Sequence, residues 1–273
     1  MRGSVRNAIK VFAASGALVA AATAPALAEE PQRSSDWTMT LGVEGRVLPQ
    51  FEGSKNSYLR PVPIFRIRRA NTPEQFRSAR DGGGVALINA GKFKAGPSFK
   101  VRLPRDESSD AALRGLGDID WTLEVGAFGE FWPVEWLRTR VELRQGFGGH
   151  KGVVGELTAD VVVPLSDRLT FSGGPRISAS TAAAASPYFS VDAAQSLASG
   201  LPVYSAGGGL RSYGAGMQVS YQFDRNWRGH TFLEYERLAG DAANSPLVTQ
   251  RGSVDQIQVG IGVTRSFTFP GLW

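Results

Sequence analysis

The stretch YLRPVPIFRIRR, residues 58–69, alternates two kinds of side chain with a period of two. Its odd positions from 59 to 67 carry leucine, two prolines, phenylalanine and isoleucine, whereas arginines stand at 60, 66 and 68. A period of two is typical of a β-strand whose two faces meet different surroundings. A soluble protein buries the apolar face in a core, whereas a membrane barrel turns it to lipid and points the arginines into a wet interior. The prolines at 61 and 63 fit a central strand poorly, because proline has no N–H to donate to a neighbour.

The same alternation recurs along most of the chain. Residues 118–127, 156–163, 212–223 and 256–264 each place apolar side chains at one parity and polar or small ones at the other. Strands of about ten residues match a tilted membrane strand and exceed the usual soluble one. The soluble alternative is a β-sandwich, which gains little from many long strands with charged faces. The sequence therefore predicts an all-β fold, a transmembrane antiparallel up-and-down β-barrel.

Turn signals divide the chain into twelve expected strands. Tight turns alternate with long loops, which is the pattern of outer-membrane barrels. An even number of strands brings both chain ends to one side, so twelve is favoured and ten is the alternative. A short helix is expected at 191–199, stopped by Gly200. The expected strands are 36–47, 58–69, 74–80, 84–90, 91–103, 118–131, 136–147, 153–163, 168–179, 208–223, 226–238 and 254–269.

The first 28 residues have the three parts of a secretory signal peptide. Three basic residues lie within the first ten, an apolar stretch follows, and Ala26-Leu27-Ala28 fits the small-x-small rule for cleavage. We therefore predict cleavage after Ala28, export to the outer membrane, and a barrel domain at residues 29–273.

Charge and cysteine content exclude two classes of function. The predicted mature chain keeps 27 basic residues against 25 acidic ones, because three of the 30 basic residues lie in the signal segment. Such a balance does not indicate a nucleic-acid partner. The sequence has no cysteine, so neither a disulfide framework nor thiol chemistry is available.

Several motifs resemble the MipA/OmpV family. The pattern P-x-F-E-G-S (49–54), followed by RPVP (60–63), is similar to the start of that family's pattern. The stretches SPYFSVDAAQSLASGLPVYSAGGGLRSYGAG (186–216) and EYERLAGDAANSPLVTQRGSVDQIQVGIGVTRSF (234–267) are similar to it nearly throughout. The resemblance covers the whole predicted mature chain, with Phe51 standing where a tyrosine is usual.

The resemblance implies a barrel in outer-membrane lipid, without catalytic residues or cofactors. The family's namesake, the MltA-interacting protein, is regarded as a scaffold that joins a lytic murein transglycosylase to a penicillin-binding murein synthase. The expectation for this chain is a non-enzymatic scaffold or structural partner for enzymes that synthesise and hydrolyse peptidoglycan. A narrow, porin-like passive channel for small solutes is the alternative.

The two histidines of the sequence are the candidates for chemistry. His150 lies in the glycine-rich stretch GFGGHKG and is interpreted as part of a solvated turn. His230 has the parity of the barrel interior, four residues before Glu234, and is expected near Ser172 or Ser220. A hydrolase would need these groups within hydrogen-bond reach. No G-x-S-x-G elbow and no zinc-ligand spacing occur, so we predict no catalytic, cofactor-binding or metal site.

The inward face of the expected barrel carries many charges of both signs. A narrow interior cannot leave these charges dry and unpaired, so we expect them to pair across strands. A small pore with a mild preference for anions is the alternative. The residues expected to face inward are Arg60, Arg66, Arg68, Lys92, Lys94, Lys100, Arg102, Arg138, Arg140, Arg144, Arg168, Arg176, Glu44, Asp118, Asp120, Glu124, Glu142, Glu156, Asp160, Glu234 and Glu236.

Overall fold

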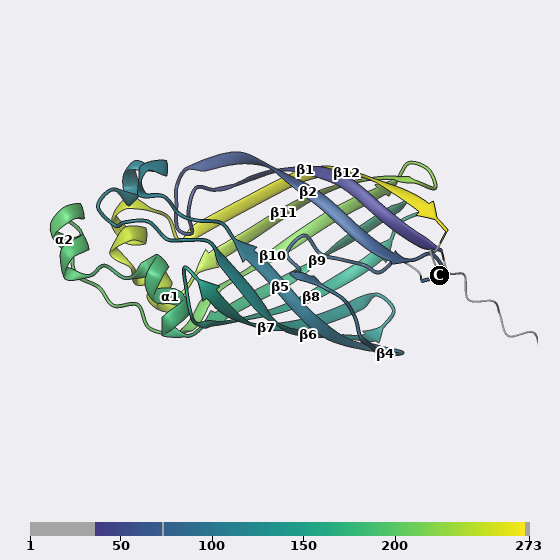
Figure 1. Cartoon of the computed structure of the whole chain (residues 1–273), viewed down its shortest axis with the longest axis horizontal. Helices are drawn as coiled ribbons and strands as arrows, with labels where there is room; N and C mark the ends of the chain where they lie inside the picture. The colour runs from purple at the N-terminus through teal and green to yellow at the C-terminus, as the bar shows by residue number, and fades with distance from the viewer. Residues whose placement is uncertain (1–35, 73, 271–273) are drawn as a thin grey trace, which may run out of the picture. The chain divides into compact units, whose positions relative to one another are not determined.

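Twelve antiparallel strands form one curled sheet in the computed structural model, which describes residues 36–72 and 74–270 (Figure 1). The predicted signal peptide and its cleavage site lie outside the described residues. Ten of the twelve strands are long and two are short, which confirms the predicted fold class. The strands are β1 (Trp37–Pro49), β2 (Ser57–Arg69), β3 (Gly83–Gly84), β4 (Ile88–Ala90), β5 (Phe93–Arg102), β6 (Thr122–Val134), β7 (Leu137–Gly148), β8 (Val153–Pro164), β9 (Leu169–Ser180), β10 (Gly209–Gln222), β11 (Trp227–Leu238) and β12 (Asp255–Phe269).

The strands follow one another around the sheet as an up-and-down meander. Their order is β2-β1-β12-β11-β10-β9-β8-β7-β6-β5, so the first long strand pairs with the last. Tight turns join β6 to β7, β8 to β9 and β10 to β11, all at the end where β1 begins and β12 finishes. We call this the tight-turn end (Figure 1, right).

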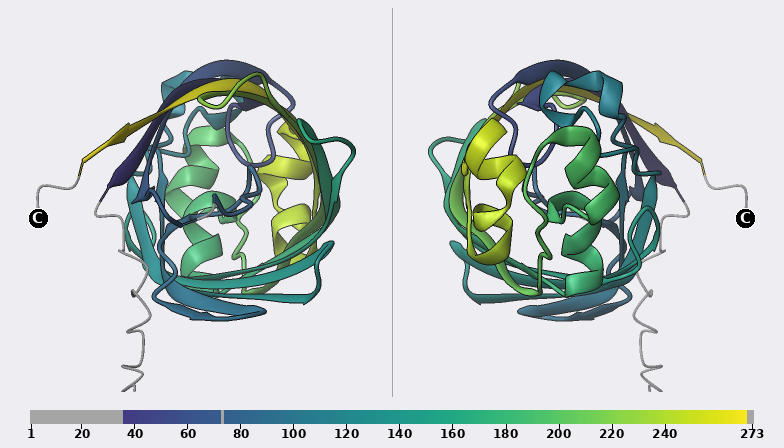
Figure 2. Two further views of the ribbon diagram at one scale, coloured as in Figure 1. Left: turned by 90° about the vertical axis from the view of Figure 1, so that its right-hand side faces the viewer. Right: turned by 90° about the vertical axis from the view of Figure 1, so that its left-hand side faces the viewer.

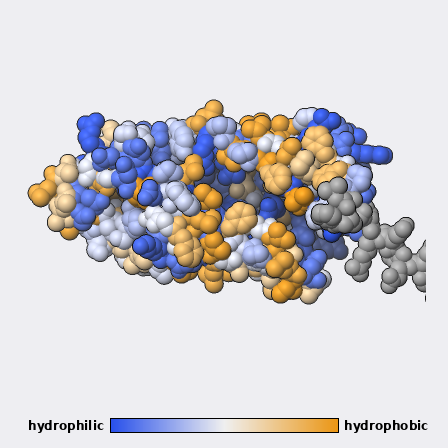
Figure 3. Space-filling view, viewed as in Figure 1, coloured by the Kyte–Doolittle hydropathy of each residue, from blue (hydrophilic) through white to orange (hydrophobic). Residues whose placement is uncertain are grey.

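The outer face of the curled sheet is apolar. Phe65 and Ile67 on β2 are 64% and 54% exposed, whereas Arg66 between them points into the interior. Outward apolar side chains recur on every long strand, which is the pattern of a lipid-facing barrel surface. Figure 3 shows them over the strand region of one face, with hydrophilic side chains more frequent toward the helical end. Among the described residues, no helix is long and apolar enough to cross a bilayer.

The two prolines of the opening stretch lie at an edge of the sheet. The N–H of Ala70 donates to the carbonyl oxygen of Asp36 at 2.8 Å, and β2 pairs with β1 without a bulge. Even-numbered N–H groups of β2 therefore face β1, and odd-numbered positions face away from it. Because Pro61 and Pro63 are odd-numbered, their missing N–H groups lie on the free edge of β2, where no ladder bond is lost.

β5, the last long strand at the other end of the sheet, has its proline on the side where the short β3 and β4 pair with it. The N–H of Trp132 donates to the carbonyl oxygen of Lys92 at 2.8 Å, so even-numbered groups of β5 face β6. The nitrogen of Pro97 therefore also faces away from its long neighbour. Within the described residues, no pairing joins β2 to β5. We call the boundary between the free edge of β2 and the side of the sheet that ends in β3, β4 and β5 the seam.

The expectation of two strands at 74–80 and 84–90 is largely wrong. No strand forms at 74–80, and only the short β3 and β4 form within and beside 84–90. Residues 74–82, which we call the inner segment, instead have side chains that contact the walls of the barrel interior. Alternation alone does not distinguish a strand from an extended segment whose polar side chains meet a polar wall.

The long connections fold together at the other end and form what we call the cap, residues 50–56, 103–121, 181–208 and 239–254 (Figure 2). Its helices are α1 (Ala182–Phe189), α2 (Ala193–Ser199) and α3 (Gly240–Asn244). Short helical turns cover Glu107–Ser109, Ala111–Leu113 and Leu247–Arg251.

Both buried apolar clusters of the described chain lie mainly in the cap. One gathers around Phe189 and Val248, and the other around Leu113 and Leu247. The predicted short helix is confirmed as α2, whose Asp192 caps the first turn and whose Gly200 ends it with a φ of 75°. The apolar core of this molecule is thus in its loops, and the barrel interior is left to polar side chains.

Candidate functional site

The barrel interior is the candidate site, and buried ion pairs fill its β6–β9 side. Arg138 is 1% exposed and reaches three carboxylates. Its guanidinium nitrogens lie 2.7 Å from Asp81, 2.9 Å from Glu130 and 3.0 Å from Asp160. Three partners around one guanidinium use its fork of donors fully, which is what a buried charge requires.

Arg144 repeats this arrangement nearer the cap. Its Nε lies 3.0 Å from Glu124 and its Nη2 lies 2.6 Å from Glu156, and it also pairs with Glu142. Lys100 approaches the same Glu156 at 3.1 Å from β5. The expected pairing of inward charges across strands is therefore confirmed on this side of the interior.

The inner segment completes the network from within. Arg80 makes a two-pronged contact with Glu236, at 2.6 and 3.0 Å. Burial would lower the pKa of Arg80, but the surrounding carboxylates, Glu236 first, raise it above its ordinary value. The N–H of Gly82 donates to Glu142 at 3.2 Å. A Cβ at Gly82 would lie 2.7 Å from that carboxylate, so a larger residue here would require the Glu142 side chain to shift.

Most residues expected to face inward do so, and four do not. Lys92 lies in the turn before β5, Asp118 and Asp120 precede the start of β6, and Arg168 lies in the turn before β9. All four side chains are exposed. The error has one cause: the expected strands began one to four residues earlier than the real ones, and parity has no meaning outside a strand.

The interpretation of His150 as part of a solvated turn is wrong. Its side chain is 2% exposed, its Nε2 lies 3.1 Å from Glu124, and its ring packs edge-on against Tyr188 of α1. The cap folds over this histidine, and no local sequence pattern indicates that contact. Nearby Arg105 donates to the carbonyl oxygen of Tyr188 at 3.1 Å, and burial lowers the pKa of Arg105 to about 10.

His230 faces the interior as expected and stands directly across from Ser220. Its Nε2, however, lies 2.5 Å from Glu44 on β1, whereas Glu234 pairs with Arg176. Ser172 stands opposite Gln218 instead. Within the described residues, no cluster of three His, Asp or Glu side chains is arranged to hold a metal ion.

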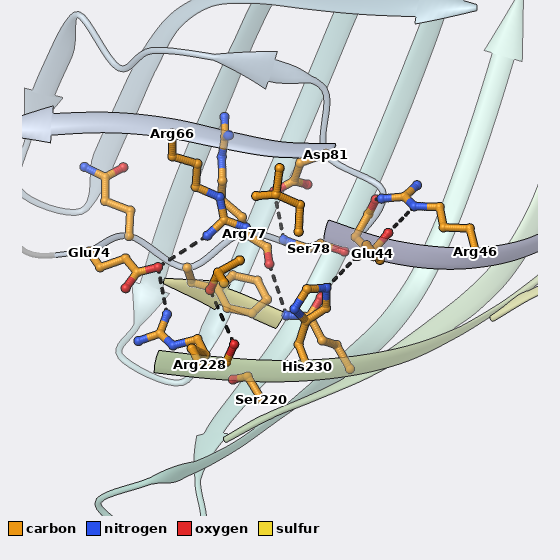
Figure 4. A pocket seen from close by; sticks show the side chains of 16 residues that line it. Glu44, Arg46, Arg66, Glu74, Arg77, Ser78, Asp81, Ser220, Arg228 and His230 are labelled. Carbon is orange, nitrogen blue, oxygen red and sulfur yellow. Dashed lines mark hydrogen bonds and ion pairs between the residues drawn. The ribbon is translucent and has the colours of Figure 1, made fainter. Parts of the chain in front are cut away.

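Two adjoining cavities occupy the tight-turn half of the interior, between the inner segment and strands β1, β2, β10, β11 and β12. Their volumes are about 170 Å³ and about 400 Å³, and both are lined by Glu74 and Arg228. The larger one reaches Arg225 and Asn226 in the turn between β10 and β11. We call the two cavities together the vestibule; Figure 4 shows the side chains around the smaller one.

Sequence reasoning missed two parts of this site. Alternation predicts a strand at 74–80, where none forms, although the run of three glycines at 82–84 marks a place where the backbone approaches something closely. Glu130, which accepts from Arg138, is a further inward residue: it lies at the inward parity of the strand expected at 118–131 but is not among the residues expected to face inward.

A known family matches most of the chain. The profile of the family described as "MltA-interacting protein MipA" matches residues 41–267. No curated protein matches the sequence.

Several solved outer-membrane channels are similar to this chain at very low sequence identity. A KdgM porin is 10% identical with a TM-score of 0.41, and the match covers 84% of this chain and 99% of that one. An outer membrane channel from Pseudomonas putida F1 is 12% identical with a TM-score of 0.45, covering 88% and 99%. A NanC porin is 10% identical with a TM-score of 0.42, covering 82% and 98%.

Proposed function

The chain belongs to the MipA family, and from that premise we propose that it is an outer-membrane barrel that acts as a scaffold or structural partner for murein enzymes. The family name points to a lytic murein transglycosylase as one partner. A penicillin-binding murein synthase is the second partner that we propose.

The closed interior supports a structural role over a conduit. Ion pairs and the inner segment fill the β6–β9 side, and the cap folds over one end. In outer-membrane barrels the tight turns face the periplasm and the long loops face outward. The tight-turn end is therefore the side from which cell-wall enzymes would reach this protein.

The test is co-purification from solubilised cell envelopes. We expect the mature protein to enrich a murein hydrolase and a murein synthase over an unrelated barrel of similar size. Ten-residue Gly-Ser insertions in the turns at 165–168 and 224–226 should reduce that enrichment, because they crowd the periplasmic surface. The matched control is the same insertion after Gly200 in the cap, where exposed loops also tolerate added residues.

The outcomes separate the proposal from its failure. Enrichment that falls with the turn insertions and survives the cap insertion supports a periplasmic scaffold. Equal recovery of both enzymes on this protein and on the unrelated barrel would remove the scaffold role.

A narrow passive channel is the second candidate function, and the vestibule is the observation that favours it. Its two cavities, of about 170 Å³ and about 400 Å³, leave open space within the tight-turn half of the interior. A channel would require this space to continue past the inner segment and the cap.

A further inference from the structure

The vestibule differs from the rest of the interior in its balance of charge. It is lined by six arginines, Arg46, Arg66, Arg68, Arg77, Arg225 and Arg228. Three carboxylates line it as well, and two of them are already paired. Glu44 pairs with Arg46 and His230, and Asp81 pairs with Arg138 on the opposite wall. Only Glu74 is left to face the remaining arginines.

Glu74 marks the point at which two guanidinium groups converge. Its Oε1 lies 3.3 Å from Nη1 of Arg66 on β2 and 2.7 Å from Nη1 of Arg228 on β11 (Figure 4). One carboxylate oxygen thus bridges two strands that are separated in the sheet by β1 and β12. The inner segment, which carries Glu74, is bound to the walls mainly through its other end, at Arg80 and Asp81.

Apart from Arg46, which pairs with Glu44, the other arginines of the vestibule have little carboxylate to neutralise them. Arg68 donates to the carbonyl oxygens of Ala70 and Thr72, and Arg77 donates to that of Gly84 at 3.0 Å. Backbone carbonyls satisfy hydrogen-bond donors but do not cancel the positive charge. The walls therefore keep a positive field around a partly enclosed space, and such a space concentrates anions.

We propose that the vestibule is a binding site for a soluble organic or inorganic oxyanion that carries two or more negative charges, as paired phosphates or carboxylates. The oxyanion enters from the tight-turn end and takes the place of the Glu74 carboxylate between Arg66 and Arg228. Glu74 thus acts as an internal competitor that holds the site while it is empty of ligand. This site goes beyond the proposed scaffold and does not depend on it.

The first reason for this assignment is geometric. Arginine presents a planar fork of donors that matches the oxygens of carboxylate and phosphate groups, and two forks from opposite walls fix a group between them. The second reason is exposure: Arg228 and Glu74 keep 36% and 30% of their side-chain surface open, so a solute can reach both. Fully buried pairs such as Arg144 with Glu124 offer no such access.

The experiment is isothermal titration of pyrophosphate, and separately of citrate, into the full mature barrel in phosphatidylcholine vesicles at low salt. Three variants accompany the wild-type protein: Glu74→Gln, Arg228→Gln and Arg237→Gln. Arg237 is the matched control, because it is an exposed arginine on β11 that pairs with one carboxylate, Asp255, away from the vestibule. Heat-modifiable mobility in gels verifies that each variant is folded.

We expect saturable binding of both oxyanions by the wild-type protein, weakened by added sodium chloride because salt screens the attraction. Glu74→Gln should tighten binding about fivefold, the factor for removing one unit charge at 4 Å in a water-like dielectric. Arg228→Gln should weaken binding by a similar factor, and Arg237→Gln should leave it unchanged.

Three results would overturn the assignment. These are no saturable binding to either the wild type or Glu74→Gln, weaker binding to Glu74→Gln than to the wild type, and equal losses from Arg228→Gln and Arg237→Gln. Each of them leaves the co-purification test untouched, so the oxyanion site and the scaffold fail or stand separately.

Discussion

At the scale of single residues, the stability of the interior depends on buried arginines that each bind several carboxylates. Arg144 is 1% exposed and contacts Glu124, Glu142 and Glu156. Replacing it by methionine keeps most of the side-chain volume and leaves three carboxylates without their shared partner. Breaking a buried pair in this way costs about 3–5 kcal/mol of folding free energy.

The measurement for Arg144→Met is reversible urea unfolding in lipid vesicles, with Arg237→Met as the control. Arg237 has one exposed partner on the outer surface, so its loss should change the unfolding midpoint much less. Equal shifts for the two variants would mean that water already enters the network around Arg144.

His150 and Arg144 illustrate what a single residue's sequence context can and cannot predict. Arg144 lies in a clear alternation, and its inward direction followed from parity. His150 lies in GFGGHKG, where no period exists, and its partners Glu124 and Tyr188 are far away along the chain. The burial of His150 depends on how the cap folds over it, and a local pattern carries no information about that.

At the scale of elements, the positions of the two prolines in β2 predict which other positions of this strand tolerate proline. Even-numbered N–H groups of β2 face β1 and odd-numbered ones face the free edge. Ile64→Pro should therefore remove a ladder bond and leave a carbonyl oxygen on β1 unsatisfied, at a cost of about 1–3 kcal/mol. Phe65→Pro should lose no such bond. Ile64→Ala and Phe65→Ala measure the separate cost of losing each side chain.

The seam prediction is checked by vesicle unfolding of the four variants. After the alanine values are subtracted, the proline at 64 should cost clearly more than the proline at 65. A larger cost at 65 would mean that the outer edge of β2 is paired with another strand in the membrane.

The strands were predictable because each carries its own period, and the inner segment was not. Nine of the ten long strands begin and end within three residues of their expected bounds, and β6 begins four residues later and ends three residues later. Residues 74–82 also place charged side chains at intervals, yet their partners are Glu236, Arg138 and Arg176, on β11, β7 and β9. Contacts at such sequence separation arise only once the barrel has formed. The vestibule was hidden for the same reason, since the inner segment forms one of its walls.

At the scale of the whole molecule, the inner segment and the cap are two barriers in series along the barrel axis. The inner segment contacts opposite walls through Arg80 and Asp81, and the cap closes the other end around its two apolar clusters. A narrow pore that is blocked at two successive points conducts only when both are removed. We therefore expect no steady current from the wild-type protein in planar bilayers.

Three variants test these two barriers in the same bilayers. One replaces residues 75–81 by a Gly-Ser linker, the second replaces residues 182–206 by a short linker, and the third combines both changes. We expect reproducible single-channel steps from the combined variant alone, because each single change leaves one barrier in place; heat-modifiable mobility verifies that the barrel has formed. Steps from one single variant would assign the seal to the segment that it lacks. Steady steps from the wild-type protein would favour the passive channel over the scaffold, since ions would then pass both the ion-paired wall and the cap.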